Sequence, residues 1–131
     1  MDNTTRWKQY VVLLAGDVLT LALVTVAGFA THGTAGTAGL RMLTTFVPLV
    51  IAWLLVAPHL GVFDPANLAA PRQLWRPAWA MLLAGPLAAW LRGVALGTAI
   101  LPVFVLVLSG VSALSLLAWR GLYCWISLRK R

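Results

Sequence analysis

Two charged side chains in this sequence stand inside long apolar runs. Asp17 interrupts the stretch Leu13–Leu23, and Arg120 lies near the end of the longest apolar run. A charge at the centre of a membrane-spanning helix costs about 2.5–3.5 kcal/mol on insertion scales, so it is expected to have a partner. An intramembrane carboxylate could either join two helices through an ion pair or exchange a proton or cation with a cavity.

Arg120 is the predicted partner of Asp17, because both lie at a similar depth below one membrane face. Asp17 follows Tyr10, a candidate interfacial aromatic, by about seven residues or roughly 10 Å of helix. Arg120 precedes two further interfacial aromatics, Tyr123 and Trp125. We interpret the pair mainly as structural, since nothing else in this half of the membrane offers a proton relay. The side of the helix that bears Asp17 is small and polar, and should pack against other helices: Thr20, Val24, Gly28 and Thr31.

A second group of residues falls near the other membrane face: Arg92, Arg41 and His32. Paired N–H donors let a guanidinium bind a carboxylate or phosphate, so this group could form an anion or lipid site. The alternative is that Arg92 marks a hydrated helix end and reaches outward to water.

No pattern of residues indicates catalysis. The sequence has no nucleophile, base and orienting group in a recognisable arrangement, and no paired thiolates. His32 and His59 fall on opposite sides of the membrane in this plan, which argues against a shared metal site. We therefore expect no catalytic residue, no metal and no cofactor, although a haem or pigment near His32 remains an alternative if a flat cavity exists there.

The composition is that of an integral membrane protein. Hydrophobic residues make up 61% and charged residues 10% of the 131 residues, whereas soluble domains contain about 25% charged residues. This length allows about four spans of about 20 residues each and no separate soluble domain. The net charge of +7 forms no stripe interleaved with exposed aromatics, so anionic lipids are expected as partners and nucleic acid is not.

The apolar runs predict an all-α bundle of four transmembrane helices in a single domain, residues 1–131. The expected helices cover approximately residues 10–30, 42–60, 77–94 and 98–125. Two alternatives remain open: a three-span chain whose third segment is re-entrant, and a first segment that is a cleaved signal peptide.

The distribution of Lys and Arg predicts the orientation. Eight basic residues fall on one side of this plan and only Arg41 and Arg92 on the other. Positive residues accumulate on the cytoplasmic side, so both termini should be cytoplasmic and the protein should lie in the cell (plasma) membrane.

Short motifs along the chain resemble an uncharacterised prokaryotic family of small multi-pass membrane proteins, a domain of unknown function. They are GD (Gly16, Asp17), Gly28 with HG (His32, Gly33), FVPLVIAW (Phe46, Pro48, Trp53), PLAAWLRG (Pro86, Arg92), Phe104 and WR (Trp119, Arg120). The resemblance implies a multi-helix membrane fold and draws attention to Asp17, His32, Arg92 and Arg120. It implies no activity.

Two functions are compatible with these observations. The first is a non-enzymatic accessory or interaction subunit of a larger membrane assembly, whose partners are the lipid bilayer and other membrane subunits or further copies of this chain. The alternative is a minimal oligomeric proton-coupled transporter or channel that uses Asp17.

Overall fold

The computed structural model describes residues 2–31 and 39–131, and all the regular structure in these ranges is helical. The elements are α1 (Asn3–Thr31), α2 (Gly39–Val56), η2 (Ala57–Leu60), η3 (Pro71–Gln73), α3 (Trp75–Leu96) and α4 (Pro102–Arg129), of which η2 and η3 are short 3-10 helices. Each long helix is long and apolar enough to cross a membrane. The expected all-α architecture with four candidate membrane spans is therefore confirmed.

The helix ends differ from the sequence-based expectation. Polar residues determine where α1 begins, and turn residues determine where α3 ends and α4 begins. α1 begins at Asn3, about two turns earlier than expected, because no proline or glycine interrupts the polar residues before Tyr10. α3 ends where Gly97 adopts a left-handed conformation (φ 62°) and donates its N–H to the carbonyl of Gly93. α4 then begins at Pro102 and not near residue 98, since proline favours the first helical position.

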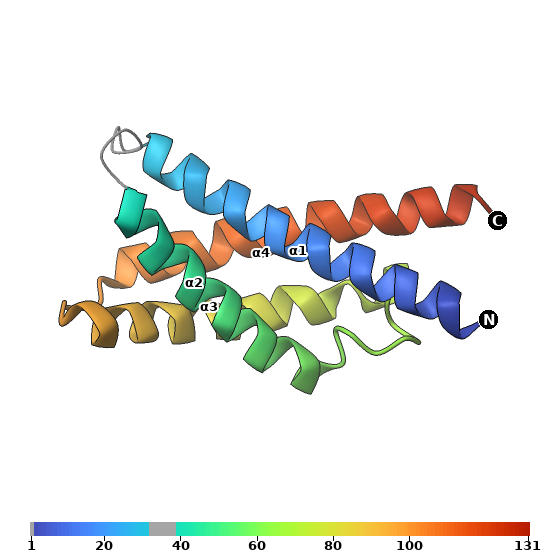
Figure 1. The fold of residues 1–131 in the computed structure, drawn as a ribbon, viewed down its shortest axis with the longest axis horizontal. Helices are drawn as coiled ribbons and strands as arrows, with labels where there is room; N and C mark the ends of the chain where they lie inside the picture. The colour runs from blue at the N-terminus through green and yellow to red at the C-terminus, as the bar shows by residue number, and fades with distance from the viewer. Residues whose placement is uncertain (1, 32–38) are drawn as a thin grey trace.

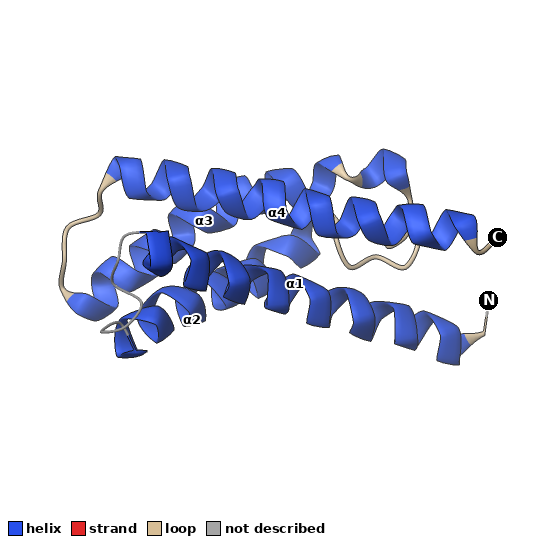
Figure 2. Ribbon diagram, turned by 90° about the horizontal axis from the view of Figure 1, so that it is seen from above, coloured by secondary structure: helices blue, strands red, loops and turns tan. Residues whose placement is uncertain are grey.

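Both termini lie at the same end of the bundle (Figure 1), which we call the termini end. The connection between α2 and α3 also lies there, whereas the connection between α3 and α4 and the end of α1 lie at the opposite end, the far end. α3 packs between α2 and α4, and α1 packs against α4 and α2. α1 and α4 approach each other near their midpoints and diverge toward the far end (Figures 1 and 2).

Small residues allow the close packing of α3. Ala80, Ala84, Gly85 and Ala88 are buried against the neighbouring helices. A Cβ atom added to Gly85 would overlap the side chain of Ser109 on α4, so this contact requires glycine. Close approach through small residues is the usual way in which helices associate in lipid, where apolar burial alone gives no net attraction.

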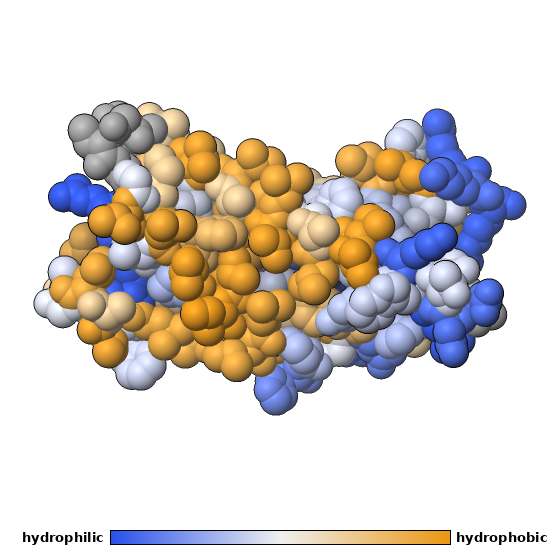
Figure 3. Space-filling model, viewed as in Figure 1, coloured by the Kyte–Doolittle hydropathy of each residue, from blue (hydrophilic) through white to orange (hydrophobic). Residues whose placement is uncertain are grey.

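The surface is divided between a broad apolar region and a hydrophilic end. Apolar residues cover the middle of the bundle and extend toward the far end, and hydrophilic residues gather at the termini end (Figure 3). The termini end carries most of the basic residues, whereas Arg41 and Arg92 belong to the far-end parts of α2 and α3. The two-sided distribution expected from the sequence is thus present; that the termini end faces the cytoplasm remains a prediction of the positive-inside rule.

Candidate functional site

The structure brings Asp17 and Arg120 together in a buried ion pair. The guanidinium makes two parallel contacts, in which Nη2 donates to Oδ2 over 2.5 Å and Nε donates to Oδ1 over 3.1 Å. Asp17 is 0% exposed and Arg120 is 3% exposed. This bidentate geometry is the strongest form of the carboxylate–guanidinium contact, and it joins α1 to α4.

Arg120 also binds the chain that follows α2. Its Nη1 donates to the backbone carbonyl of Val62 over 3.2 Å, and its guanidinium carbon lies 5.6 Å from the centre of the Phe63 ring. The carbonyl and the ring offer partial negative charge to the part of the guanidinium that Asp17 does not contact. One arginine therefore connects three segments of the fold.

Trp53 of α2 completes the surroundings of Asp17. Its indole Nε1 donates to Oδ2 of the carboxylate over 3.3 Å, and the side chain is fully buried. The ring of Phe63 meets that of Trp53 edge to face, with centroids 6.2 Å apart. Packing thus fixes the indole that bonds to the carboxylate, so α2 is tied to the same ion pair.

Gly16 permits the close approach of α4 beside the ion pair. A Cβ atom at this position would overlap the indole of Trp119, so the ring lies directly against the backbone of α1. The Nε1 of Trp119 is buried and has no hydrogen-bond partner among the described residues. The indole lies close enough to Asp17 for its N–H dipole to stabilise the carboxylate.

This arrangement, which we call the central clamp, consists of Asp17, Arg120, Trp53, the Val62 carbonyl and Phe63. Both carboxylate oxygens accept bonds from the guanidinium, and one also accepts the indole N–H. Exchange of a proton or cation at Asp17 would require these contacts to break in a place with no water access. The geometry is therefore that of a device that fixes α1, α2, α4 and the α2–α3 connection relative to each other.

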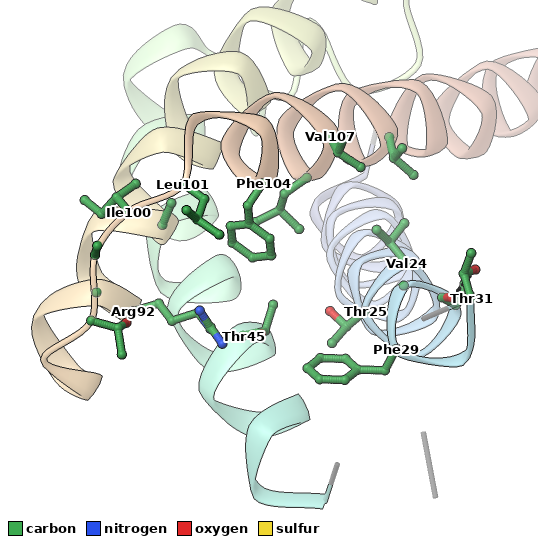
Figure 4. A pocket seen from close by; sticks show the side chains of 18 residues that line it. Val24, Thr25, Phe29, Thr31, Thr45, Arg92, Ile100, Leu101, Phe104 and Val107 are labelled. Atoms are coloured by element: carbon green, nitrogen blue, oxygen red, sulfur yellow. Dashed lines mark hydrogen bonds between the residues drawn. The ribbon is translucent and has the colours of Figure 1, made fainter. Parts of the chain in front are cut away.

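The second predicted group is only partly brought together. Arg92 of α3 lines a cavity of about 540 Å³ at the far end of the bundle (Figure 4). Arg41 is exposed on the first turn of α2 and is not among the residues that line this cavity. His32 lies outside the described residues.

The predicted small and polar stripe of α1 packs differently from the expectation. Leu21 and Thr25 are buried, whereas Gly28 and Thr31, which were expected to pack against other helices, are exposed. The physical reason is that α1 diverges from α4 toward the far end (Figures 1 and 2). The far-end part of the stripe therefore lines the cavity and not a helix contact.

Sequence reasoning missed the partners of the ion pair that carry no charge. Trp53 belongs to one of the motifs that indicated the family, yet its spacing gives no sign that its N–H reaches Asp17. The Val62 carbonyl has no sequence signature at all, because a backbone acceptor is present at every residue. An indole in an otherwise aliphatic run was the only available signal, since a buried Trp N–H usually finds a partner.

The described residues contain no group of three or more His, Cys, Asp and Glu side chains that could hold a metal ion. Cys124 is buried on α4 with a free thiol. Neither observation adds a further candidate site to the central clamp and the Arg92 cavity.

Comparison with known protein families gives a match over most of the chain. The family described as Protein of unknown function (DUF3054) matches residues 14–123, a range that includes Asp17, Arg92 and Arg120. No curated protein and no solved structure matches the chain. The match covers most of the sequence, and the chain therefore belongs to the DUF3054 family.

Proposed function

We propose that this chain is a non-enzymatic multi-pass protein of the cell (plasma) membrane, with cytoplasmic termini, that acts as an interaction subunit of a larger membrane assembly. Its four helices form a scaffold that the central clamp holds in one arrangement. Its partners in this proposal are other membrane proteins, in addition to the lipid bilayer and its anionic lipids.

The observation that carries the proposal is that both carboxylate oxygens of the buried Asp17 accept hydrogen bonds from Arg120. Asp17 is the only acidic residue in the apolar runs, because the other two acids, Asp2 and Asp64, lie before α1 and between α2 and α3. A carboxylate that serves ion coupling needs access to water or substrate, and Asp17 has none (0% exposed). The one obvious residue for transport is thus used in holding the helices together.

The surface best suited to a partner is the tryptophan face of α3, defined by Trp75, Trp79 and Trp90. At 100° per residue these side chains fall within an arc of about 60°, and each is about half exposed. Trp75 is the first residue of α3, and Trp79 lies one turn further along the helix. Tryptophan is enriched among the residues that contribute most to protein–protein binding, because it offers a large rigid surface at low entropic cost.

Native mass spectrometry of the protein extracted from its source membranes tests this proposal. A stoichiometric second protein is the expected result, and a photoreactive side chain at position 79 should crosslink to it. The matched control is the same photoreactive side chain at Leu114, which is 69% exposed on α4. Recovery of the chain without any second protein, or equal crosslinking from both positions, would contradict the proposal.

The alternative is an oligomeric proton-coupled transporter or channel that uses Asp17. An Asp17→Asn variant distinguishes the two functions in reconstituted vesicles. Transport predicts a folded variant that has lost a proton-coupled flux. The interaction function predicts a lower yield of folded protein, as expected when one member of a buried ion pair is removed.

A further inference from the structure

A cavity lies at the far end, between the diverging ends of α1 and α4 (Figure 4). Its volume of about 540 Å³ falls within the range of about 300–1,000 Å³ that is typical of small-molecule sites. α2 and α3 close the cavity on the inner side through Thr45, Ala89 and Arg92. The central clamp contributes no residue to it.

Arg92 brings a positive charge into this cavity without a counter-charge from the chain. The sequence has only three acidic residues. Asp17 is bound to Arg120, and Asp2 and Asp64 belong to segments at the termini end (Figure 1). The Nε of Arg92 is buried and makes no hydrogen bond to any described residue. A buried guanidinium N–H that no described residue satisfies is available to an acceptor that enters the cavity.

The guanidinium of Arg92 is directed into the cavity. Arg92 extends from α3 toward the space between α2 and α4 (Figure 4), and its guanidinium carbon lies 5.3 Å from the centre of the Phe104 ring. The ring supports one face of the planar group and does not use its N–H donors. A carboxylate or phosphate in the cavity could therefore receive two of these donors in parallel.

The other walls are apolar. Val24, Ile100, Val107 and Leu108 are among the lining residues. The hydroxyl groups of Thr25 and Thr45 already donate to carbonyls of their own helices. An inorganic anion would not cover the apolar walls, which would remain in contact with water. A plain hydrocarbon would cover them but would offer Arg92 no hydrogen-bond acceptor. The lining fits a molecule with one anionic group and a long apolar body.

The cavity is open to the surface that faces the bilayer. Ala27 of α1 and Val107 of α4 line it from the two sides, and both are exposed, Val107 to 56%. The gap therefore continues outward between two membrane-spanning helices, where the surroundings are lipid hydrocarbon. An amphiphile could enter sideways from the bilayer with its head group at the level of Arg92.

We propose that this cavity binds a single-chain lipid acid, with the anionic head on Arg92 and the acyl chain between α1 and α4. The volume of about 540 Å³ is of the size that holds one small organic molecule, and the gap between α1 and α4 continues outward for the rest of a longer chain. This inference does not depend on the interaction function proposed above, since the tryptophan face of α3 and the cavity share no residue.

The test uses spin-labelled palmitate and the full-length protein in phosphatidylcholine nanodiscs. The expected result is a motionally restricted signal that unlabelled palmitate displaces and that palmityl alcohol and inorganic phosphate do not. Equal displacement by the alcohol would show that the charge is not recognised and would overturn the proposal. Displacement by phosphate alone would show a site for free anions and not for a lipid.

Variants separate the head-group contact from the chain contact. Arg92→Gln is expected to weaken palmitate binding about ten- to hundredfold, the usual effect of losing a charged hydrogen-bond donor. Arg41→Gln, which removes another far-end arginine outside the cavity, should leave the affinity unchanged. An Arg92→Gln protein that folds and binds palmitate as well as the unchanged chain would overturn the proposal.

Gly28→Leu tests the chain contact independently of charge and of the folding of the Arg92 variant. A Cβ at Gly28 meets nothing within 4 Å, and Gly28 lines the cavity, so a leucine side chain there should fill it and displace palmitate. Gly110→Leu is the matched control, because its Cβ is equally free and Gly110 does not line the cavity. Equal binding by the two leucine variants would exclude the cavity as the site of the acyl chain.

Discussion

The indole Nε1 of Trp53 donates a hydrogen bond to Oδ2 of Asp17, the same oxygen that receives the Nη2 donor of Arg120. Trp53 belongs to α2, Asp17 to α1 and Arg120 to α4. A single carboxylate oxygen is therefore the point at which three membrane helices meet. Substitutions at this point should change the stability of the whole bundle and not of one helix pair.

Trp53→Phe should lower the free energy of unfolding by roughly 2 kcal/mol, because it removes a hydrogen bond to a charged group and leaves a small gap. The measurement is thermal or denaturant unfolding of the purified protein in detergent. Trp90→Phe is the control, since Trp90 is 53% exposed and should change little. In an Asp17→Asn background the effect of Trp53→Phe should shrink; an undiminished effect would show that packing alone accounts for it.

Removal of either partner of the ion pair should be strongly destabilising. Asp17→Asn and Arg120→Gln each leave one buried charge without its counter-charge, which typically costs about 3–5 kcal/mol. The double variant leaves two neutral amide side chains and should unfold at a higher temperature than Arg120→Gln alone. The yield of folded protein and the midpoint of thermal unfolding in detergent measure both effects.

The charge swap Asp17→Arg with Arg120→Asp provides a second check on the same pair. It should express better than either single change, because it restores opposite charges at matched depth. If the swapped protein is no better expressed than both single variants, the two residues act separately and the central clamp is not a unit.

The ion pair could be predicted from the sequence because charges are rare in apolar runs. Asp17 and Arg120 stood out against their surroundings, and a common depth followed from the helix rise. The uncharged partners could not be predicted, since an indole or a backbone carbonyl gives the same sequence pattern whether it bonds to a carboxylate or not. The four membrane-spanning helices were predictable because the length and hydropathy of the apolar runs determine the spans. The exact helix ends were not, because they depend on the cap and turn residues at each end.

The cavity could not be predicted, although Arg92 could be identified. The stripe that contains Gly28 and Thr31 was expected to pack against another helix, because small residues favour close contact. The length of the contact between α1 and α4 depends instead on the angle at which the two helices cross. This angle depends on the bulk of side chains on both helices, Trp119 against Gly16 among them, and no single segment carries that information.

Gly16→Ala should destabilise the bundle by about 1–3 kcal/mol, the usual effect of overpacking. The added methyl group would displace the indole of Trp119, which lies beside the ion pair. Gly28→Ala is the matched control on the same helix, because its Cβ meets nothing within 4 Å. Since alanine favours helix formation over glycine at both positions, an equal gain in stability for the two variants would show that Trp119 moves aside freely.

The contact between Gly85 and Ser109 gives a prediction that a compensating change can test. Gly85→Ala should lower stability by about 1–3 kcal/mol, because the new methyl group would overlap the Ser109 side chain at the α3–α4 contact. Adding Ser109→Gly removes the Oγ and Cβ atoms that it would meet. The double variant should recover part of the loss, and only part, since a Cβ at position 85 would still lie 3.0 Å from the Cα of Ser109.

Gly110→Ala controls for helix propensity in this experiment, because it neighbours Ser109 and its Cβ is unobstructed. The thermal midpoints of the two single variants and the double variant form a cycle that isolates the interaction between positions 85 and 109. A favourable coupling in the double variant is the expected result. Simple addition of the two single effects would mean that α3 and α4 separate to accommodate the methyl group, and that the close approach at Gly85 is not required for the bundle.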